Sequence, residues 1–198
     1  MLDLCLGTGL LEFFCFVADR KVADPVARFS TQWDAYGKLA EQLVVAATHP
    51  DELVSIMADN YSTPDHILFE EDLKASVNRR LRRLAVVMVC RLDSRSSDGL
   101  QLADLLTSAA TFEFRAEAGL ASHTSHKGIV ASHLRDMLGA STFLSGWRKS
   151  THSVQIYKDG TATTRQLLLE SRVLRDPDLQ PILRPWLRFH GCVSLGRE

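Results

Sequence analysis

The sequence lacks the cysteine and histidine spacings that indicate a disulfide framework or a zinc site. It has four cysteines and seven histidines. No two cysteines form a Cys-x-x-Cys pair, and no histidines form a His-x-x-x-His or His-Glu-x-x-His pattern. Three of the cysteines lie in apolar runs, as buried free thiols of a reducing compartment do; the four are Cys5, Cys15, Cys90 and Cys192. We therefore expect free thiols, no zinc and a soluble intracellular protein.

An excess of charge of one sign and a long hydrophobic run are also missing. The chain has 23 basic and 24 acidic residues, a formal net charge of -1. No global charge therefore attracts the protein to nucleic acid or to an anionic membrane. The apolar stretch Leu2–Val17 is interrupted by charged residues and glycines, lacks a basic leader and is too short to span a bilayer. We expect a cytoplasmic protein with no membrane segment, in which any contact with nucleic acid comes from a local patch.

Short apolar runs alternate with segments of helical periodicity. Strands are predicted at Leu10–Ala18, Leu53–Ala58, Leu84–Cys90 and Val154–Tyr157. Helices are predicted at Trp33–Ala47, His66–Arg83, Leu100–Ala118 and Ile129–Leu138, the first capped by Ser30 or Thr31 and the last stopped by Gly139. Alternation of this kind, with fully apolar strands, is typical of an α/β fold whose parallel or mixed sheet is covered on both faces.

The carboxy-terminal segment has a different character. Arg165–Leu174 is compatible with a helix, but prolines interrupt the chain after it, at Pro177, Pro181 and Pro185. We therefore predict one main domain over residues 1–158 and a loosely attached tail over residues 159–198.

Acidic and amide side chains gather where ligands of α/β sheets bind. Asp59 follows the second predicted strand, and Asp93 lies in the loop after the third. Gln101 and Asp104 are three residues apart in the next helix, on one face. Because ligands gather at the carboxyl ends of strands, Asp59 and Asp104 are candidates to meet there and hold Mg²⁺ or Mn²⁺. The alternative is that Gln101 and Asp104 only cap or solvate the start of the helix.

The segment from Asp93-Ser94 to the run Leu-Gln-Leu-Ala-Asp-Leu-Leu at 100–106 resembles the bacterial and phage family called domain of unknown function 3800. That family is marked by an early Asp-Glu pair and a later Gln-x-x-Asp motif, and the resemblance extends from about Leu10 to Tyr157. It implies a ribonuclease H-like mixed sheet flanked by helices, with acidic residues that bind two metal ions for phosphodiester cleavage. By this resemblance Asp59 and Asp104 are the catalytic metal ligands, and Gln101 and Asp93 orient them.

The family's amino-terminal Asp-Glu has no counterpart before the Leu10 strand. The only early Asp-Glu, Asp51-Glu52, lies between a predicted helix and a predicted strand, so the role is not transferred to it. We therefore expect an amino-terminally shortened member with impaired catalysis. Two classes of function stay open: a metal-dependent nuclease or phosphodiester-processing protein, and a non-catalytic remnant or binding module on the same scaffold.

One basic cluster is present, at the end of the second predicted helix. It consists of Arg79, Arg80, Arg82 and Arg83. These side chains are candidates to contact the phosphates of a nucleic acid near the metal site. The alternative is a solvated helix end, where cations are favoured by the helix dipole.

Overall fold

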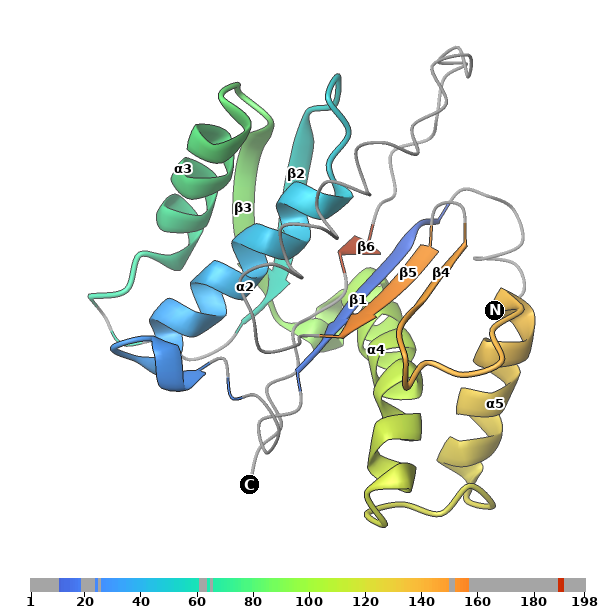
Figure 1. The fold of residues 1–198 in the computed structure, drawn as a ribbon. Coiled ribbons are helices and arrows are strands. Elements are labelled where there is room, and N and C mark those ends of the chain that lie inside the picture. Colours follow the sequence, from blue (N-terminus) through green and yellow to red (C-terminus); the bar gives the residue numbers. More distant parts are fainter. Residues whose placement is uncertain are drawn as a thin grey trace.

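The structure is a computed structural model that describes residues 11–18, 24, 26–60, 64, 66–149, 152–156 and 189–190. The described strands are β1 (Phe13–Val17), β2 (Val54–Asp59), β3 (Val86–Leu92), β4 (Trp147–Lys149), β5 (His152–Ile156) and β6 (Phe189–His190) (Figure 1). The helices are α2 (Gln32–Ala47), α3 (Phe69–Leu81), α4 (Asp98–Glu117) and α5 (His126–Leu138), with short 3-10 turns η1 (Val26–Arg28) and η2 (Ser94–Ser96). The predicted α/β class is confirmed. In the described ranges no helix is long and apolar enough to cross a membrane.

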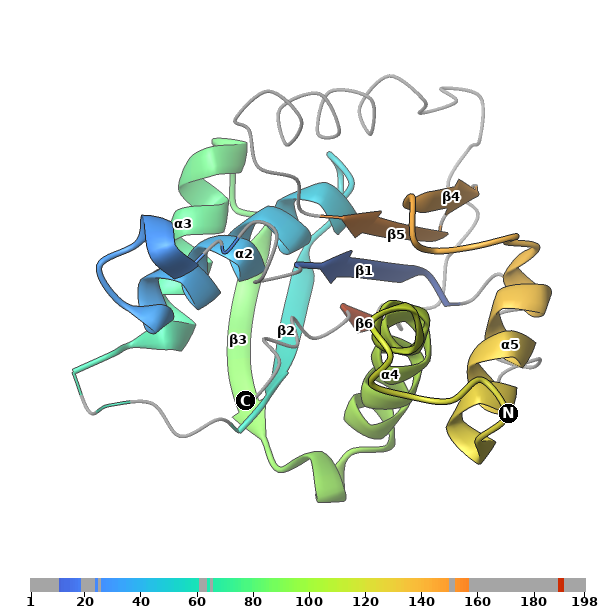
Figure 2. The same ribbon diagram turned by 60° about the horizontal axis from the view of Figure 1, so that its bottom comes forward.

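The described strands form two sheets rather than the single sheet predicted. One has the order β4-β5-β1-β6, in which β1 is parallel to β5 and β6 while β4 is antiparallel to β5. The other is the parallel pair β2-β3. Figure 2 shows the strands of the two sheets running in different directions. The predicted parallel and mixed pairing is confirmed, and the two sheets leave one edge of β2 without a strand partner among the described residues.

The larger core lies between β1, β5 and the helix pair α4 and α5, and we call it the α4–α5 core. Its largest fully buried side chains are Phe13, Leu106, Leu134, Phe143 and Val154. Helix α5 ends at Gly139, whose φ of 67° suits a glycine, as predicted. Cys15 lies in this core as a free thiol, and burial raises its pKa to about 12.

A smaller core, the α2–α3 core, lies under β2 and β3. It consists of Val44, Val45, Ile56, Phe69, Leu73, Val77 and Val86. The expectation that both faces of these strands are buried is wrong for the described structure, because Met57 and Met88 are 45% and 50% exposed. An apolar run fits a half-covered strand as well as a fully covered one, so the sequence could not distinguish them.

Side-chain hydrogen bonds set the limits of the elements around this core. Thr31 caps α2 in a capping box, its hydroxyl accepting from the N–H of Asp34 and its own N–H donating to the Asp34 carboxylate. Helix α3 begins at Phe69, three residues later than predicted, and ends before Arg82, whose φ of 54° is left-handed. Asn78 accepts from the N–H groups of both Ala85 and Val86 at 2.8 Å, which fixes the start of β3 two residues after the predicted one.

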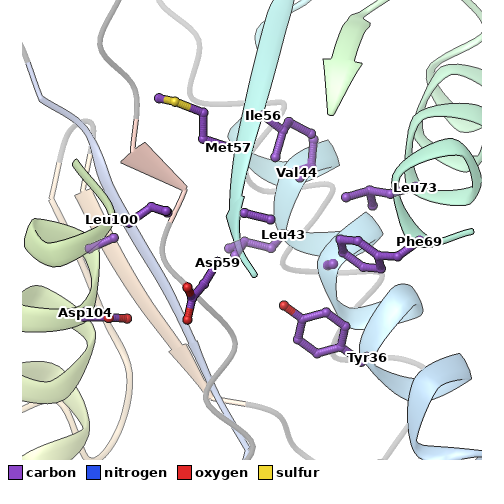
Figure 3. A pocket seen from close by; sticks show the side chains of 13 residues that line it. Tyr36, Leu43, Val44, Ile56, Met57, Asp59, Phe69, Leu73, Leu100 and Asp104 are labelled. Atoms are coloured by element: carbon purple, nitrogen blue, oxygen red, sulfur yellow. The ribbon is translucent and has the colours of Figure 1, made fainter. Parts of the chain in front are cut away.

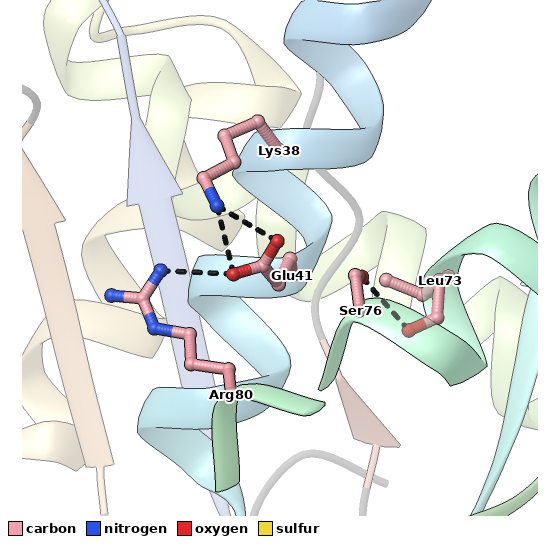
Figure 4. A network of polar contacts seen from close by, with 5 residues as sticks. All are labelled: Lys38, Glu41, Leu73, Ser76 and Arg80. Atoms are coloured by element: carbon pink, nitrogen blue, oxygen red, sulfur yellow. Dashed lines mark hydrogen bonds and ion pairs between the residues drawn. The ribbon is translucent and has the colours of Figure 1, made fainter. Parts of the chain in front are cut away.

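A buried carboxylate joins α2 to α3. Glu41 is 6% exposed, and its oxygens accept hydrogen bonds of 2.9 Å from Lys38 and Arg80 (Figure 4). Burial raises the pKa of Glu41, but the hydrogen bonds from Lys38 and Arg80 more than offset this, so the pKa lies below its ordinary value. The two helices are therefore held together by charge as well as by the α2–α3 core.

Of the predicted tail, Phe189 and His190 form β6 beside β1. The remainder, residues 159–188 and 191–198, lies outside the described residues, as do Cys5 and Cys192. The three-residue strand β4 was not predicted, because Trp147, Arg148 and Lys149 show no apolar alternation.

Candidate functional site

Asp59 and Asp104 come together as predicted, from two different elements. Asp59 is the last residue of β2. Asp104 lies in the second turn of α4, a helix that begins after η2 and is capped by the Ser97 hydroxyl. Both residues line one pocket, and Figure 3 shows their carboxylates pointing toward one another. The carboxyl end of a strand and the start of a helix thus place two anionic groups at one point.

The rest of the pocket is apolar apart from one hydroxyl. Its other lining residues come from α2, β2, α3 and α4: Tyr36, Ala40, Leu43, Val44, Ile56, Met57, Ala58, Phe69, Leu73, Leu100 and Ala103. The rings of Tyr36 and Phe69 contact each other, with centroids 5.3 Å apart. In Figure 3 the Tyr36 hydroxyl is turned toward Asp59. The pocket therefore combines an aromatic and aliphatic wall with a strongly anionic end.

The charge of Asp59 acts on the ionisation of Asp104. Asp104 lines the pocket and is exposed, but its partial burial and the negative charge of Asp59 raise its pKa. Among the described residues neither side chain has a cationic partner. A bound cation at this point would relieve the repulsion. In the same part of the chain, no group of three or more His, Cys, Asp or Glu side chains is arranged to hold a metal ion.

Asp93 and Gln101 do not join the two aspartates in the pocket lining. The Asp93 carboxylate accepts from the N–H of Arg95 at 2.9 Å and caps η2. The Gln101 amide donates to the Arg95 carbonyl at 3.3 Å. Both side chains thus form hydrogen bonds within the turn between β3 and α4. They can affect the position of Asp104 only by stabilising that turn, which precedes its helix.

The arginine cluster lies away from the carboxylates. Phe69, which lines the pocket, begins α3, whereas Arg79 lies near its end, about 15 Å further along the axis at 1.5 Å per residue. Arg80 binds Glu41, and Arg83 donates to the backbone carbonyls of His49 and Glu52. Arg79 and Arg82 are exposed and make no side-chain ion pair within the described part of the chain. The cluster therefore serves mainly to join α3 to its neighbours.

The open edge of β2 is a feature of the site that the sequence did not reveal. Four consecutive β2 residues, Ile56 to Asp59, line the pocket, although successive side chains of a strand point to opposite faces. The pocket must therefore run along the strand's edge. On the other edge, the N–H groups of Val54 and Asn60 donate to Ala85 and Leu92 beside β3. By alternation the backbone N–H and C=O of Met57 point to the pocket side, where the described chain provides no partner.

Comparison with protein-family models, with curated proteins and with solved structures gave no match to this chain.

Proposed function

We propose that the chain binds one Mg²⁺ or Mn²⁺ ion between Asp59 and Asp104 and acts on phosphodiester bonds there. The observation that carries the proposal is the meeting of these two carboxylates at the carboxyl end of β2, without a cationic side chain between them among the described residues. Hard oxygen ligands of this kind are what Mg²⁺ and Mn²⁺ prefer. The resemblance to the domain of unknown function 3800 family assigns the same two residues to metal binding.

The residues fit one ion better than two. Mg²⁺ is often held by one or two carboxylates together with several waters, which Asp59 and Asp104 can provide. A pair of ions needs further carboxylates to offset their charge, and the described residues supply no third acidic ligand. A single bound ion would polarise a phosphoryl oxygen as a Lewis acid. The residues of this chain would hold the ion, and the pocket would hold the part of the substrate that lies next to the phosphate.

A ribonuclease H-like arrangement is part of this proposal. The parallel pair β2-β3 and the following α4 place one carboxylate at a strand end and one on a helix. The resemblance predicts the same origin for the two ligands.

Metal binding is tested most directly with Asn substitutions, which remove a charge with little change in shape. Calorimetric titration of the full chain with MnCl₂ should show binding that falls at least about tenfold in both Asp59→Asn and Asp104→Asn, because each variant loses one of two anionic ligands. Asp98→Asn is the matched control, since Asp98 is an exposed residue of the same helix that does not line the pocket. Unchanged Mn²⁺ affinity in both site variants would contradict the proposal.

The small ligand set also supports a second candidate, a binding module that holds nucleic acid through the metal without cleaving it. Incubation with single- and double-stranded DNA and RNA, with and without Mg²⁺ or Mn²⁺, separates the two. Metal-dependent cleavage that Asp104→Asn abolishes supports the enzyme. Metal-dependent retention of intact nucleic acid supports the binding module.

A further inference from the structure

We infer that the outer face of the β2-β3 pair binds one Cu(I) ion through the sulfur atoms of Met57, Met88 and Cys90. The inference goes beyond the proposed function and does not rest on it, because it uses a different ligand chemistry and neither of the two aspartates. Three features carry it: the strand register that places the sulfurs on one face, the exposure of that face, and the chemistry of the ligand set.

The register places two of the sulfur side chains opposite each other. Met57 pairs with Cys90, about 4.8 Å away across the two strands. The preceding pair, Ile56 and Val89, packs in the α2–α3 core, so Met57 and Cys90 point to the other face. Figure 3 shows Met57 and Ile56 pointing to opposite sides of β2. Met88 precedes Cys90 by two residues in β3 and therefore shares its face, about 6.6 Å along the strand.

An irregularity at the start of the pair turns Met88 to this outer face. The register moves from Val54 opposite Val86 to Ser55 opposite Met88, so Val87 is an extra residue in β3. Such a bulge re-aims the side chains that follow it. Without the bulge, Met88 would point to the same side as Val86, which is 0% exposed in the α2–α3 core. The bulge thus adds a second thioether to the face that carries Cys90.

The face is open enough for an ion to reach the sulfurs. Both methionines are about half-exposed, and Cys90 is a half-buried free thiol. The Cys90 thiol donates a weak hydrogen bond of 3.6 Å to the Ile56 carbonyl, which directs its sulfur toward β2. Methionine normally fills gaps in a core, and its three rotatable bonds let it adapt. Here the two thioethers are free to move onto an ion that the thiol holds.

The ligand set suits a soft monovalent ion. Thiolate and thioether sulfurs select Cu(I), whereas carboxylate and carbonyl oxygens suit Mg²⁺ and Mn²⁺. The Cys90 thiol gives up its proton to water as the sulfur–copper bond forms, and the copper stays Cu(I). One thiolate then balances the single charge of the ion, and the thioethers of Met57 and Met88 add none. The complex is neutral, which limits the cost of placing it on an apolar face.

Competition for Cu(I) tests the inference. We would titrate the full chain anaerobically with Cu(I) in the presence of bicinchoninate, in a Cys5→Ser/Cys192→Ser background that removes the thiols outside the described residues. Cys90→Ser, Met57→Leu and Met88→Leu should each weaken Cu(I) binding at least about tenfold, because even groups that only support a metal ligand are often worth that much. Leucine keeps the volume of methionine and lacks the sulfur. Met137→Leu is the matched control, since Met137 packs against the α4–α5 core.

X-ray absorption at the copper edge gives a second readout. The background protein should show three sulfur neighbours and Met88→Leu two, and circular dichroism checks that each variant is folded. Asp104→Asn should leave Cu(I) binding unchanged, which separates this site from the proposed Mg²⁺ or Mn²⁺ site. Absence of Cu(I) binding, or a Cu(I) affinity and a sulfur count that neither methionine substitution changes, overturns the inference.

Discussion

Around β1 and β5, fifteen buried side chains of the described chain form the α4–α5 core, whereas seven form the α2–α3 core beside β2 and β3. The smaller region compensates with polar contacts, among them Asn78 to the start of β3, Glu41 to Arg80, and Arg83 to two carbonyls of the preceding loop. The pocket with Asp59 lies mainly in this smaller region. The comparison suggests that one region supplies most of the stability while the other, less dependent on apolar packing, carries the site.

The largest effect is expected from cavities in the two cores. Leu134 and Val77 are both 0% exposed, the first in the α4–α5 core and the second in the α2–α3 core. Leu134→Ala should lower the free energy of unfolding by about 2–5 kcal/mol, and Val77→Ala by about 1–3 kcal/mol, because fewer contacts and a smaller volume are lost. Urea denaturation measures both values. A larger loss for Val77→Ala would reverse the comparison.

The next effect concerns the polar contacts of the smaller region. Asn78→Ala should lower the free energy of unfolding by about 2–3 kcal/mol, because it leaves the N–H groups of Ala85 and Val86 without their acceptor. Asn60→Ala is the control, since Asn60 is exposed and should change stability by less than about 0.5 kcal/mol. Equal stability of the two variants in urea would show that the smaller region does not depend on this side chain.

A smaller, pH-dependent effect is expected for Glu41→Gln. The folded-state pKa of Glu41 lies below its ordinary value of 4.5, so its contribution is fully present above that pH and is lost as the pH falls through the lower folded value. Glu41→Gln should therefore lower the free energy of unfolding by about 1–2 kcal/mol at pH 7 and by progressively less in acid. Urea denaturation between pH 7 and pH 3 gives the profile, with exposed Glu117→Gln as control. A deficit that stays constant over this range would contradict the assigned ion pair.

The smallest effect is a gain of stability. Arg82 has a φ of 54°, a left-handed conformation that costs a residue with a Cβ about 1–2 kcal/mol. Glycine avoids this strain but has more freedom in the unfolded chain, so Arg82→Gly should raise the free energy of unfolding by about 0.5–1 kcal/mol. Arg82→Ala serves as control because it removes the same charge and keeps the strain. Thermal unfolding of the two variants distinguishes backbone strain from charge.

Much of the fold could be predicted because local patterns dictate it. The Thr31 cap, the apolar face of α2 and the glycine that ends α5 are all readable from neighbouring residues. The exposure of β2 and β3 could not be predicted from neighbouring residues, since apolar side chains on a strand do not reveal how many layers cover it. The pairing of β6 depends on β1, a partner far away in the chain, for which single-sequence patterns carry no signal. Strand β4 pairs with its neighbour β5, but its three residues show no apolar alternation that would mark a strand.

The candidate site was predicted in its charges but not in its shape. Asp59 and Asp104 could be found because strand ends and helix starts meet at one edge of α/β structures. Tyr36 and Phe69 looked like ordinary helix positions, and only the tertiary contact between their rings places them in the pocket. Asp93 and Gln101 form local hydrogen bonds to Arg95, which their residue types favour but do not distinguish from a role beside a metal.

The pairing of β1 has a consequence for the order in which the protein folds during synthesis. β1 is hydrogen-bonded to β5 and β6, and the Phe13 N–H donates to His152, 139 residues later in the chain. At roughly 5–20 residues per second, the ribosome needs about 7 to 28 seconds to make the 139 residues that separate the two. β2 and β3, separated only by α3, can pair much sooner. The region that carries the pocket is therefore expected to form first. Until β5 has been synthesised, β1 remains an unpaired apolar strand, which chaperones are suited to protect.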